Sequence, residues 1–442
     1  MKKINIGIIG FGNIGCGVVK ILQQRRFLLA QKIGVEIVIK KICDKDIAAK
    51  RDLRIDKNIL TIDVNEIIND PQIDIIVELI GGINPAKEFI LAALKNGKHV
   101  VTANKALLAE SGNELFSAAG QRGKNICFEA SVGAGIPIIK SIKEGLVANK
   151  FSCIFGIVNG TSNYVLTQMS KEGCSFSNAI SQAKAKGFAE KDPTLDIEGI
   201  DSAHKLVLLT YLAYGRIVKI KDIFIEGISR ISAADIAYAK ELGYKIKLLA
   251  IAKKEVDQLE VRVHPAFLPV NHLLSSVDGV FNAIYVSSDL AGDLMFYGPG
   301  AGQLPAASAV VSDIVDLTQD IKAGLFKPTL NSIQDNSIKS LRGIDEFENK
   351  YYIRITVVDK PGVLAKISGI LAKFGISIAS VTQKEKLRAQ VVPVVMVTHE
   401  VKEKNLRNAL KMIDKLKEIK EKSVAIRIEG VTEPPIDNGH IG

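Results

Sequence analysis

The stretch KINIGIIGFGNIG, residues 3–15, decides the fold of the N-terminal part of the chain. Apolar residues dominate positions 3–9, as in a short buried strand, and a glycine-rich turn follows before a helix that continues through Leu22. In a strand–turn–helix unit, G-x-G-x-x-G spacing permits the tight turn and lets a pyrophosphate approach the helix N-terminus. We therefore predict a unit that binds a dinucleotide; a glycine turn without a ligand is the alternative. The expected contacts are Gly10, Gly12, Asn13, Ile14 and Gly15.

The second predicted strand, about residues 35–43, ends on Asp44. An acid at this place accepts a hydrogen bond from the ribose 2′-hydroxyl and favours NAD, although it lies farther from the glycines than is usual. Lys45 and Arg51 follow closely, and their cations would suit a 2′-phosphate. The two signals conflict, so we predict NAD(P) as the cofactor with a lean to NADP.

Two further strands are predicted at residues 73–80 and 99–101. In an open parallel sheet, ligands gather beyond the carboxyl ends of the strands. The tetrapeptide T-A-N-K, from Thr102 to Lys105, falls at such an end. Lys105 is therefore either a group that faces the nicotinamide and the substrate or a surface lysine that opens the next helix.

The segment GFAEKDPTLDIEGIDSAHK, residues 187–205, carries an unusual concentration of charge directly before an apolar run. The run, residues 206–214, suits a buried helix that ends at Gly215. One or two carboxylates before a helix are explained by its dipole, but five within twelve positions exceed that need. Asp201 and Lys205, at i and i+4, share one helical face. From the residues alone, a solvated acidic loop and a catalytic segment are equally good interpretations.

Two loops interrupt the regular pattern elsewhere. Residues 128–137 contain two glycines and a proline beside Glu129, which indicates either a hinge or an oxygen-only site for a hard cation. Residues 297–305 are rich in glycine and proline and precede an apolar helix over 306–317. This second loop either caps that helix or returns the chain to the nucleotide-binding domain.

A compact C-terminal unit follows a polar stretch, residues 327–350, that has the character of a linker. The predicted order is βαββαβ, a ferredoxin-like arrangement. Residues 431–442 are expected to form a loose tail. The predicted strands and helices of the unit are strand 352–358, helix 363–374, strands 376–384 and 390–398, helix 402–416 and strand 424–429.

Composition limits the classes of function. The 442 residues are 47% hydrophobic and contain no uninterrupted apolar run of eighteen residues, which argues against a membrane span. Five cysteines never spaced as CxxC argue against a disulfide framework and a zinc site, and favour a reducing, cytoplasmic compartment. The net charge of +10 is spread along a chain without tryptophan, so we interpret it as a lysine-rich surface and not as a nucleic-acid site.

The motifs together resemble the homoserine dehydrogenase family over essentially the whole chain. Residues 187–205 match its signature G-(F/Y)-A-E-x-D-P-x-x-D-x-x-G-x-D-x-x-x-K at every fixed place. T-x-N-K at 102–105 and N-G-T-x-N at 159–163 are also similar to the family, as is G-P-G-A-G-x-x-P-x-A-S-A-V-x-x-D from residue 298. D-K-P-G-V-L-A-x-I from residue 359 resembles the ACT domain, a regulatory module that binds amino acids.

The resemblance implies a reversible, NAD(P)-dependent oxidation of L-homoserine to L-aspartate 4-semialdehyde, in the biosynthesis of threonine, methionine and isoleucine. It implies Lys205 as the proton donor, with Lys105 orienting the substrate and able to share the proton; no sequence argument separates the two lysines. Asp201 would be a catalytic and substrate-binding carboxylate, and Glu190 and Asp196 would also bind substrate. The resemblance further implies cofactor contacts at Thr102, Lys105, Gly187 and Gly302.

Further expectations follow from the same resemblance. A sodium or potassium ion would be held by Glu129 and the carbonyls of Val132, Ala134 and Ile136. The ACT unit would sense L-threonine through Asp359, Gly362 and Leu364. A homodimer through the central domain is expected, with ACT pairing as a route to a homotetramer.

The expected fold class is α/β, with a Rossmann-type domain, an α+β substrate domain and a ferredoxin-like ACT domain. The expected boundaries are 1–133 plus about 300–326 for the nucleotide domain, 134–299 for substrate binding and dimerisation, 327–350 for the linker, 351–430 for ACT and 431–442 for the tail. One rival is another dehydrogenase with an ACT tail, such as 3-phosphoglycerate dehydrogenase, but we find no equivalent of its Arg-Glu-His set. The other is a sensor without turnover, against which Lys105, Asp201 and Lys205 argue.

Overall fold

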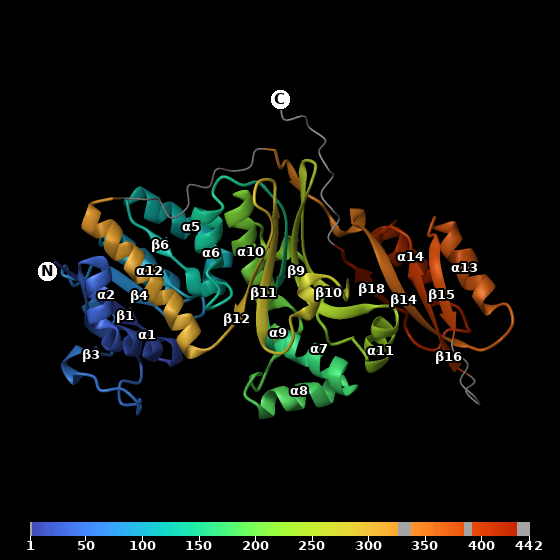
Figure 1. The fold of residues 1–442 in the computed structure, drawn as a ribbon, viewed down its shortest axis with the longest axis horizontal. Helices are drawn as coiled ribbons and strands as arrows, with labels where there is room; N and C mark the ends of the chain where they lie inside the picture. The colour runs from blue at the N-terminus through green and yellow to red at the C-terminus, as the bar shows by residue number, and fades with distance from the viewer. Residues whose placement is uncertain (1, 326–336, 384–390, 431–442) are drawn as a thin grey trace.

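The computed structural model describes residues 2–325, 337–383 and 391–430. Three parts follow one another along the long axis of the molecule (Figure 1). The nucleotide-binding part lies at one end, a mixed α+β part lies in the middle, and the ferredoxin-like part lies at the other end. The predicted fold class is confirmed.

The N-terminal sheet is parallel throughout and has the strand order β3-β2-β1-β4-β5-β6. Alternate side chains of its strands enter different cores: Val77 faces the helices α1 and α12, whereas Ile76 faces α4 and α5. Helices therefore cover both faces, as in a doubly wound fold. The bounds of the strands are β1 Lys3–Ile9, β2 Glu36–Cys43, β3 Leu60–Thr61, β4 Ile75–Glu78, β5 His99–Thr102 and β6 Ile126–Cys127. The helices are α1 Asn13–Gln24, α2 Arg26–Ile33, α3 Asn65–Ile68, α4 Ala86–Lys95 and α5 Lys105–Gln121.

The long helix α12, Gln303–Ala323, joins this first domain from far along the chain. It crosses α1 in Figure 1, and a Cβ atom on Gly17 of α1 would lie 2.9 Å from the Cβ atom of Ala307. Glycine at this position thus allows the two helices to approach closely. The loop at residues 297–305 accordingly brings the chain back to the nucleotide-binding domain, one of the two predicted alternatives.

The middle part is built on a long sheet of order β12-β11-β7-β9-β10, which continues into β18-β14-β16-β15. The strands of the middle part are β7 Phe151–Ile157, β8 Phe224–Ile225, β9 Tyr244–Glu255, β10 Gln258–Pro269, β11 Phe281–Ser288 and β12 Gly292–Pro299. Its helices are α6 Ile138–Lys140, which runs into a π-turn at Ser141–Gly145, α7 Gly160–Glu172, α8 Phe176–Ala185, α9 Thr194–Ile197, α10 Ile200–Tyr214 and α11 Ala233–Glu241.

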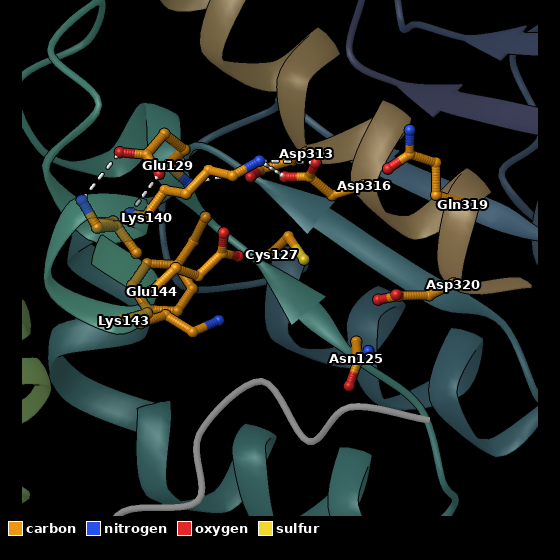
Figure 2. Close-up of a pocket in the computed structure, with 12 residues that line it drawn as sticks. Asn125, Cys127, Glu129, Lys140, Lys143, Glu144, Asp313, Asp316, Gln319 and Asp320 are labelled. Atoms are coloured by element: carbon orange, nitrogen blue, oxygen red, sulfur yellow. Dashed lines mark hydrogen bonds and ion pairs between the residues drawn. The ribbon is translucent and has the colours of Figure 1, made fainter. Parts of the chain in front are cut away.

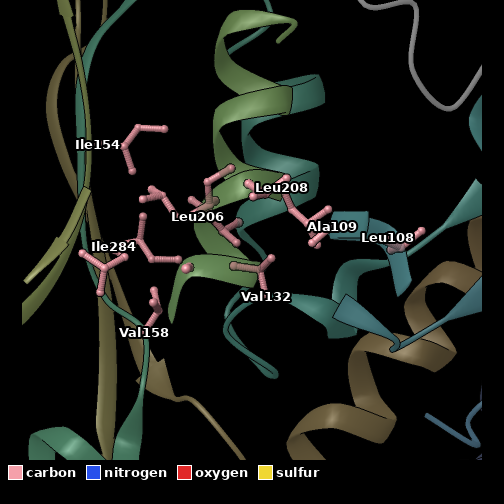
Figure 3. Packing of buried hydrophobic residues seen from close by; sticks show 14 of the residues in the cluster. Leu108, Ala109, Val132, Ile154, Val158, Leu206, Leu208 and Ile284 are labelled. Carbon is pink, nitrogen blue, oxygen red and sulfur yellow. The ribbon is translucent and has the colours of Figure 1, made fainter. Parts of the chain in front are cut away.

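Helix α10 is the apolar helix predicted after the acidic segment, and it begins at Ile200, so that Asp201 lies in its first turn. Gly199 and Gly215 flank it with φ values of 81° and 66°, which confirms the predicted glycine cap at its end. Figure 3 shows α10 between the central sheet and helix α5, with Leu206 and Leu208 inside the shared core. The helix thus joins the middle part to the nucleotide-binding domain.

The C-terminal unit has the predicted βαββαβ order, with a short additional strand β17. Its first strand begins at Glu348, earlier than predicted. The bounds are β13 Ser340–Leu341, β14 Glu348–Val358, α13 Val363–Lys373, β15 Ile378–Gln383, β16 Val391–Thr398, β17 Val401–Lys402, α14 Glu403–Ile413 and β18 Val424–Ile428. Lys384 and Gln390, at the predicted ends of two strands, lie outside the described residues, as do the first part of the predicted linker and the tail.

The sequence did not predict that the two sheets are continuous. Strand β18 pairs in parallel with β10 through Ala266↔Arg427 and Phe267↔Ile428, and β13, from the predicted linker, also pairs with β10. Pairing between strands so distant in sequence leaves no local periodicity to detect.

In the part of the chain that the structure describes, no helix combines the length and apolar character needed to span a membrane.

Candidate active site

The glycine-rich loop has the shape that a dinucleotide requires. A Cβ atom on Gly10, where φ is 103°, would lie 2.7 Å from the Leu79 carbonyl carbon, and one on Gly15 would collide with the Gly10 carbonyl oxygen. A Cβ atom on Gly12, in contrast, would meet no atom within 4 Å. The first and third glycines are therefore needed for the turn itself, while the second leaves space at the N-terminus of α1. Asn13 and Ile14 form the first turn of that helix.

Asp44 and Arg51 brace this loop from the end of β2. Asp44 Oδ2 accepts a hydrogen bond from the Phe11 amide at 2.5 Å, and Arg51 Nε donates to the Phe11 carbonyl at 2.9 Å. The guanidinium also lies 4.4 Å from the centre of the Phe11 ring. Both a carboxylate and a cation thus stand beside the expected ribose position, whereas Lys45 extends to solvent. The structure keeps the conflict between NAD and NADP that the sequence posed.

Lys105 is held at the start of helix α5, beyond the carboxyl end of β5. Asn104 caps the helix by accepting from the Leu107 amide at 3.2 Å, and its side chain donates to the Gly82 carbonyl at 2.6 Å. Thr102 donates through Oγ1 to Glu78 Oε2 at 2.6 Å, so its hydroxyl is directed at the sheet. Lys105 therefore leaves the sheet edge from a rigid turn.

The carboxylate of Asp201 joins two lysines from different domains. Its Oδ1 atom lies 3.1 Å from Lys105 Nζ, and its Oδ2 atom lies 2.7 Å from Lys205 Nζ. Lys205 also donates to the Val158 carbonyl at 2.5 Å. The side chain of Lys205 is 10% exposed and that of Lys105 is 38% exposed, so the first is shielded from water and the second is open to it.

Burial and charge shift the protonation of this cluster in defined directions. Desolvation lowers the pKa of Lys205, and the Asp201 carboxylate partly opposes that change. The pKa of Asp201 is strongly lowered even though burial alone would raise it, because Lys205 and Lys105 both stabilise its charge. A buried lysine with a lowered pKa is suited to giving up and taking back a proton.

Asn159 is a member of the cluster that the sequence did not single out. Its side-chain amide donates to Asp201 Oδ2 at 2.9 Å and to Asp196 Oδ1 at 2.7 Å, while its oxygen caps α7 by accepting from the Ser162 amide. Asn159 thereby ties two of the predicted carboxylates together. The N-G-T-x-N motif was the available signal, because its first residue both opens a helix and follows a strand.

Glu78 is a second residue that the sequence did not identify. It is buried at the end of β4, where it accepts from the Thr102 hydroxyl and, at 2.9 Å, from the Ile80 amide. Burial raises the pKa of its carboxyl group, although these hydrogen bonds oppose the change. Glu78 positions the turn that carries Lys105. An acid in an otherwise apolar strand was the signal.

Not every predicted residue joins the cluster. Glu190 is exposed in the segment between α8 and α9, and within the described residues it makes no hydrogen bond or ion pair with Asp201, Asp196 or the two lysines. Gly187, with φ of 74°, lies in the same exposed segment. Gly302, with φ of 124°, is the residue before α12. Their predicted contacts with substrate and cofactor stay predictions.

Comparison with known proteins agrees with this geometry. The family model for homoserine dehydrogenase matches residues 137–315, that for the homoserine dehydrogenase NAD binding domain matches 10–129, and that for the ACT domain matches 351–418. The chain is 40% identical over 439 residues to a homoserine dehydrogenase of Neisseria gonorrhoeae, covering 98% of this chain and 100% of the relative.

Solved structures are similar over the same length. A homoserine dehydrogenase from Thiobacillus denitrificans matches with a TM-score of 0.88 and 40% identity, over 97% of this chain and 99% of that one. One from S. aureus at pH 7.5 matches with a TM-score of 0.76 and 36% identity, over 98% and 100%. The chain belongs to the homoserine dehydrogenase family. As a member of it, the protein is an NAD(P)-dependent oxidoreductase that carries an ACT domain.

The loop that the family resemblance assigns to a cation lies beside a polar cavity of about 360 Å³. Figure 2 shows Glu129 near Lys140, with acids of α12 on the opposite side. The two carboxylate oxygens of Glu129 accept from the amides of Ile139 and Lys140 at 2.9 and 2.8 Å, and its own amide donates to Asp313 at 2.8 Å. Burial raises the pKa of the Glu129 carboxyl group despite these bonds. A cation beside this carboxylate would offset its desolvation.

The backbone of the same loop partly fits that role. Gly133 and Ala134 have φ values of 71° and 47°, which places this turn in the left-handed region. The Ile136 carbonyl already accepts from the Ile138 amide at 2.8 Å. No group of three or more His, Cys, Asp or Glu side chains in the described part of the chain is arranged to hold a metal ion. A site here would therefore depend on one carboxylate and on carbonyls, among them those of Val132 and Ala134, and such oxygen ligands suit a hard cation.

The predicted regulatory turn lies at the start of α13. Asp359 accepts from the Gln383 side chain at 3.3 Å, and Gly362 adopts φ of 86° as the residue before the helix. Leu364 is 41% exposed, which leaves it available for contact. The turn thus has an open surface, and the identity of its ligand stays a prediction.

Proposed function

We propose that this protein interconverts L-homoserine and L-aspartate 4-semialdehyde with NAD(P). The single observation that carries the proposal is the bridge of Asp201 between Lys105 and Lys205, which brings the sheet edge of the nucleotide-binding domain to the first turns of α10. A carbonyl substrate between the two lysines would face both the expected cofactor position and a shielded proton donor.

Bound NAD(P) supplies the hydride chemistry in this reaction. In the reductive direction, Lys205 would donate a proton to the aldehyde oxygen as it becomes a hydroxyl group, and in oxidation it would take that proton back. Two of the three N–H groups of its ammonium are directed to Asp201 and to the Val158 carbonyl. No acceptor for the third is found among the described residues, so it would face the substrate, and donation would need no rearrangement of the other two.

The remaining charged groups would orient the substrate. Lys105 is open to water on one side and would contact the substrate directly, with a share in the proton transfer as the alternative role. Asp196 and Asp201, tied together through Asn159, would accept hydrogen bonds from the substrate ammonium. Glu190, which lies in an exposed segment, would have to approach when the substrate binds.

For the cofactor we retain the lean to NADP, supported by Lys45 and Arg51 near the end of β2. Lys45→Ala removes an exposed cation without touching the braced loop. It should raise KM for NADPH and leave KM for NADH unchanged; equal effects on both would remove the lean.

We also propose a sodium or potassium ion at Glu129, feedback by L-threonine through the turn at Asp359, Gly362 and Leu364, a cytoplasmic location and a homodimer or homotetramer. The desolvated carboxylate of Glu129 supports the cation, and the exposed turn of the ACT domain supports feedback by threonine. The cytoplasmic location rests on the cysteine pattern, and the oligomeric state rests on the family resemblance. The domain boundaries given above are proposed with them, although β13 shows that part of the linker pairs with the central sheet.

The reaction is tested by cofactor oxidation with L-aspartate 4-semialdehyde and by cofactor reduction with L-homoserine. Lys205→Met should lower kcat by about 10²- to 10⁴-fold in both directions, the range for loss of a general acid or base. Lys105→Met should chiefly raise KM for the substrate. Full turnover by Lys205→Met would assign the role of proton donor to Lys105. Absence of turnover by the unaltered protein would favour a sensor without enzyme activity.

A further inference from the structure

A cavity of about 420 Å³ lies where the ACT sheet meets the middle part of the chain. It is bounded by the loop 226–231 on one side and by Lys422 and the first residues of β18 on the other. Its lining includes neither the catalytic cluster at Asp201 nor the turn at Asp359. The volume falls in the range of about 300–1,000 Å³ that is typical of small-molecule sites.

A proline in β10 explains why the sheet opens here. Ala266 pairs with Arg427, so Pro265 stands opposite Ile426, at the point where the parallel ladder would continue. Proline has no N–H to donate, and the ladder between β10 and β18 ends at this position. The Glu429 amide donates to the Phe267 carbonyl at 2.9 Å, and strand alternation therefore puts the Ala425 carbonyl on the same open edge of β18. Pro265 cannot satisfy that acceptor.

The groups around the cavity combine both signs of charge. Glu226 uses Oε2 to accept from Arg427 at 2.9 Å, and its Oε1 atom takes no hydrogen bond from the described residues. Arg230 and Lys422 are exposed at the rim, and neither has a hydrogen-bond or ion-pair partner within the described part of the chain. An ammonium group would suit Glu226 and the Ala425 carbonyl, and a carboxylate would suit the two cations.

We propose that this cavity binds a small zwitterion of the α-amino acid class. Its ammonium group contacts Glu226 and the open edge of β18, and its carboxylate lies between Arg230 and Lys422. The site is separate from the regulatory turn at Asp359. This binding site goes beyond the proposed function. The proposal rests on that function only in the experiment that uses enzyme activity as its readout.

The same loop reaches the catalytic segment by direct contacts. The Ile228 amide donates to the Ile197 carbonyl at 2.9 Å, and the Glu226 amide donates to the Val263 carbonyl at 2.8 Å. A Cβ atom on Gly227 would lie 2.6 Å from the Glu198 Cα atom, so the two segments are in close contact. Ile197 and Glu198 lie between Asp196 and Asp201. A ligand that holds the loop 226–231 therefore acts on the acids that position Lys205.

The binding test uses the full-length protein and isothermal titration with each proteinogenic L-amino acid in turn. For the amino acid that binds, the N-acetyl derivative and the methyl ester remove one charge each. Arg230→Ala and Lys422→Ala alter exposed side chains outside the catalytic cluster, and Lys221→Ala removes an exposed lysine that does not line the cavity. Asp359→Ala reports on the regulatory turn.

We expect one or more amino acids to bind, and Arg230→Ala and Lys422→Ala to weaken that binding by at least about tenfold each, as for a charge-assisted hydrogen bond. Both derivatives should bind more weakly, while Lys221→Ala and Asp359→Ala should bind as the unaltered protein does. Binding by no amino acid, or binding that is unchanged in both cavity variants, overturns the site. Loss of amino-acid binding in Asp359→Ala alone also overturns the proposed site, because the amino acid then occupies the turn at Asp359.

Turnover provides the second readout. The bound amino acid should change kcat/KM for L-homoserine in the unaltered protein and lose this effect in Arg230→Ala. Binding without any change in rate overturns the contact route through the loop 226–231. Absence of turnover before any amino acid is added is a failure of the proposed function, and the titration then still decides whether the cavity is a binding site.

Discussion

Asp201 is predicted to set the protonation state of Lys205, and Asp201→Asn tests this directly. The substitution keeps the size of the side chain and its place in the first turn of α10. It removes the negative charge 2.7 Å from Lys205 Nζ and 3.1 Å from Lys105 Nζ. Lys205 is then left as a buried cation without its paired carboxylate, and the Asp196 carboxylate is the weaker negative charge that remains.

The size of the effect follows from this geometry. Two unit charges at the Lys205–Asp201 distance attract by about 6 kcal/mol in an effective dielectric of about 20, which is an upper bound because both groups are desolvated. Removing one partner of a buried ion pair costs about 3–5 kcal/mol in practice. If Lys205 avoids this cost by losing its proton, its acid–base equilibrium moves toward the neutral form by a factor on the order of 10²–10³.

The direction of the pH dependence separates this effect from simple damage. Aldehyde reduction needs protonated Lys205, so its rate is retained below the pKa of that group and is lost as the pH rises through it. The Asp201 carboxylate holds this pKa up against desolvation, so in Asp201→Asn the loss should occur at lower pH. Homoserine oxidation needs neutral Lys205, and its rate should persist to lower pH in the variant.

The assay is kcat/KM against pH in both directions. We expect reduction at neutral pH to fall by at most about 10²- to 10³-fold and to recover in part on acidification, while oxidation falls less. Asp192→Asn is the matched control, because this acid of the same segment is exposed and, within the described residues, its side chain bonds only to Thr194. Profiles of Asp201→Asn that keep the unaltered shape, or an equal displacement in Asp192→Asn, would refute the reasoning.

Three further predictions concern other parts of the chain. Gly12→Ala should keep the normal melting temperature but raise KM for the cofactor, since its Cβ atom enters the open space at the start of α1. Gly15→Ala should lower the melting temperature, because its Cβ atom meets the Gly10 carbonyl oxygen, and equal melting temperatures of the two variants would contradict this. Burial lowers the pKa of Lys247 from 10.5 to about 8, so the folded state binds fewer protons than the unfolded state between pH 8 and 10.5. Across this range the free energy of unfolding should therefore rise by about 3 kcal/mol more than it does for Lys247→Met, as measured by denaturant unfolding. The same dependence on pH in both proteins would disprove it. Asp235→Ala leaves Arg354 without its buried partner between the middle part and the ACT sheet, and should cost about 3–5 kcal/mol in the same assay, against no measurable loss for the exposed Asp222→Ala.

The parts of the site that the sequence predicted have local causes. The glycine spacing depends on three backbone positions within one turn, and the Asp201–Lys205 pair depends on one helical repeat. Both can be recognised without knowing the rest of the fold. The position of Lys105 could also be predicted from the sequence, because in a parallel sheet the carboxyl end of β5 lies at the edge where ligands bind.

The parts that were not predicted depend on contacts between distant segments. Asn159 reaches Asp196 and Asp201 only because β7 and α10 pack together, and no spacing in the sequence reports that contact. The same holds for the parallel pairing of β10 with β18, which joins two sheets that the polar stretch before residue 350 suggested were separate. Glu190 occupies a motif position but lies outside the cluster in the structure, so its predicted contact with the substrate stays a prediction.

The acidic segment is followed directly by an apolar run for a structural reason. A lysine with a lowered pKa must be desolvated, and a carboxylate must be fixed beside it if it is to remain a controlled proton donor. Helix α10 provides both, because its apolar residues anchor it between α5 and the central sheet while its first turns carry Asp201 and Lys205 (Figure 3). The core that holds the two domains together therefore also sets the distance between Lys205 and Lys105, so loosening the packing of Leu206 or Leu208 acts on the chemistry as well as on stability.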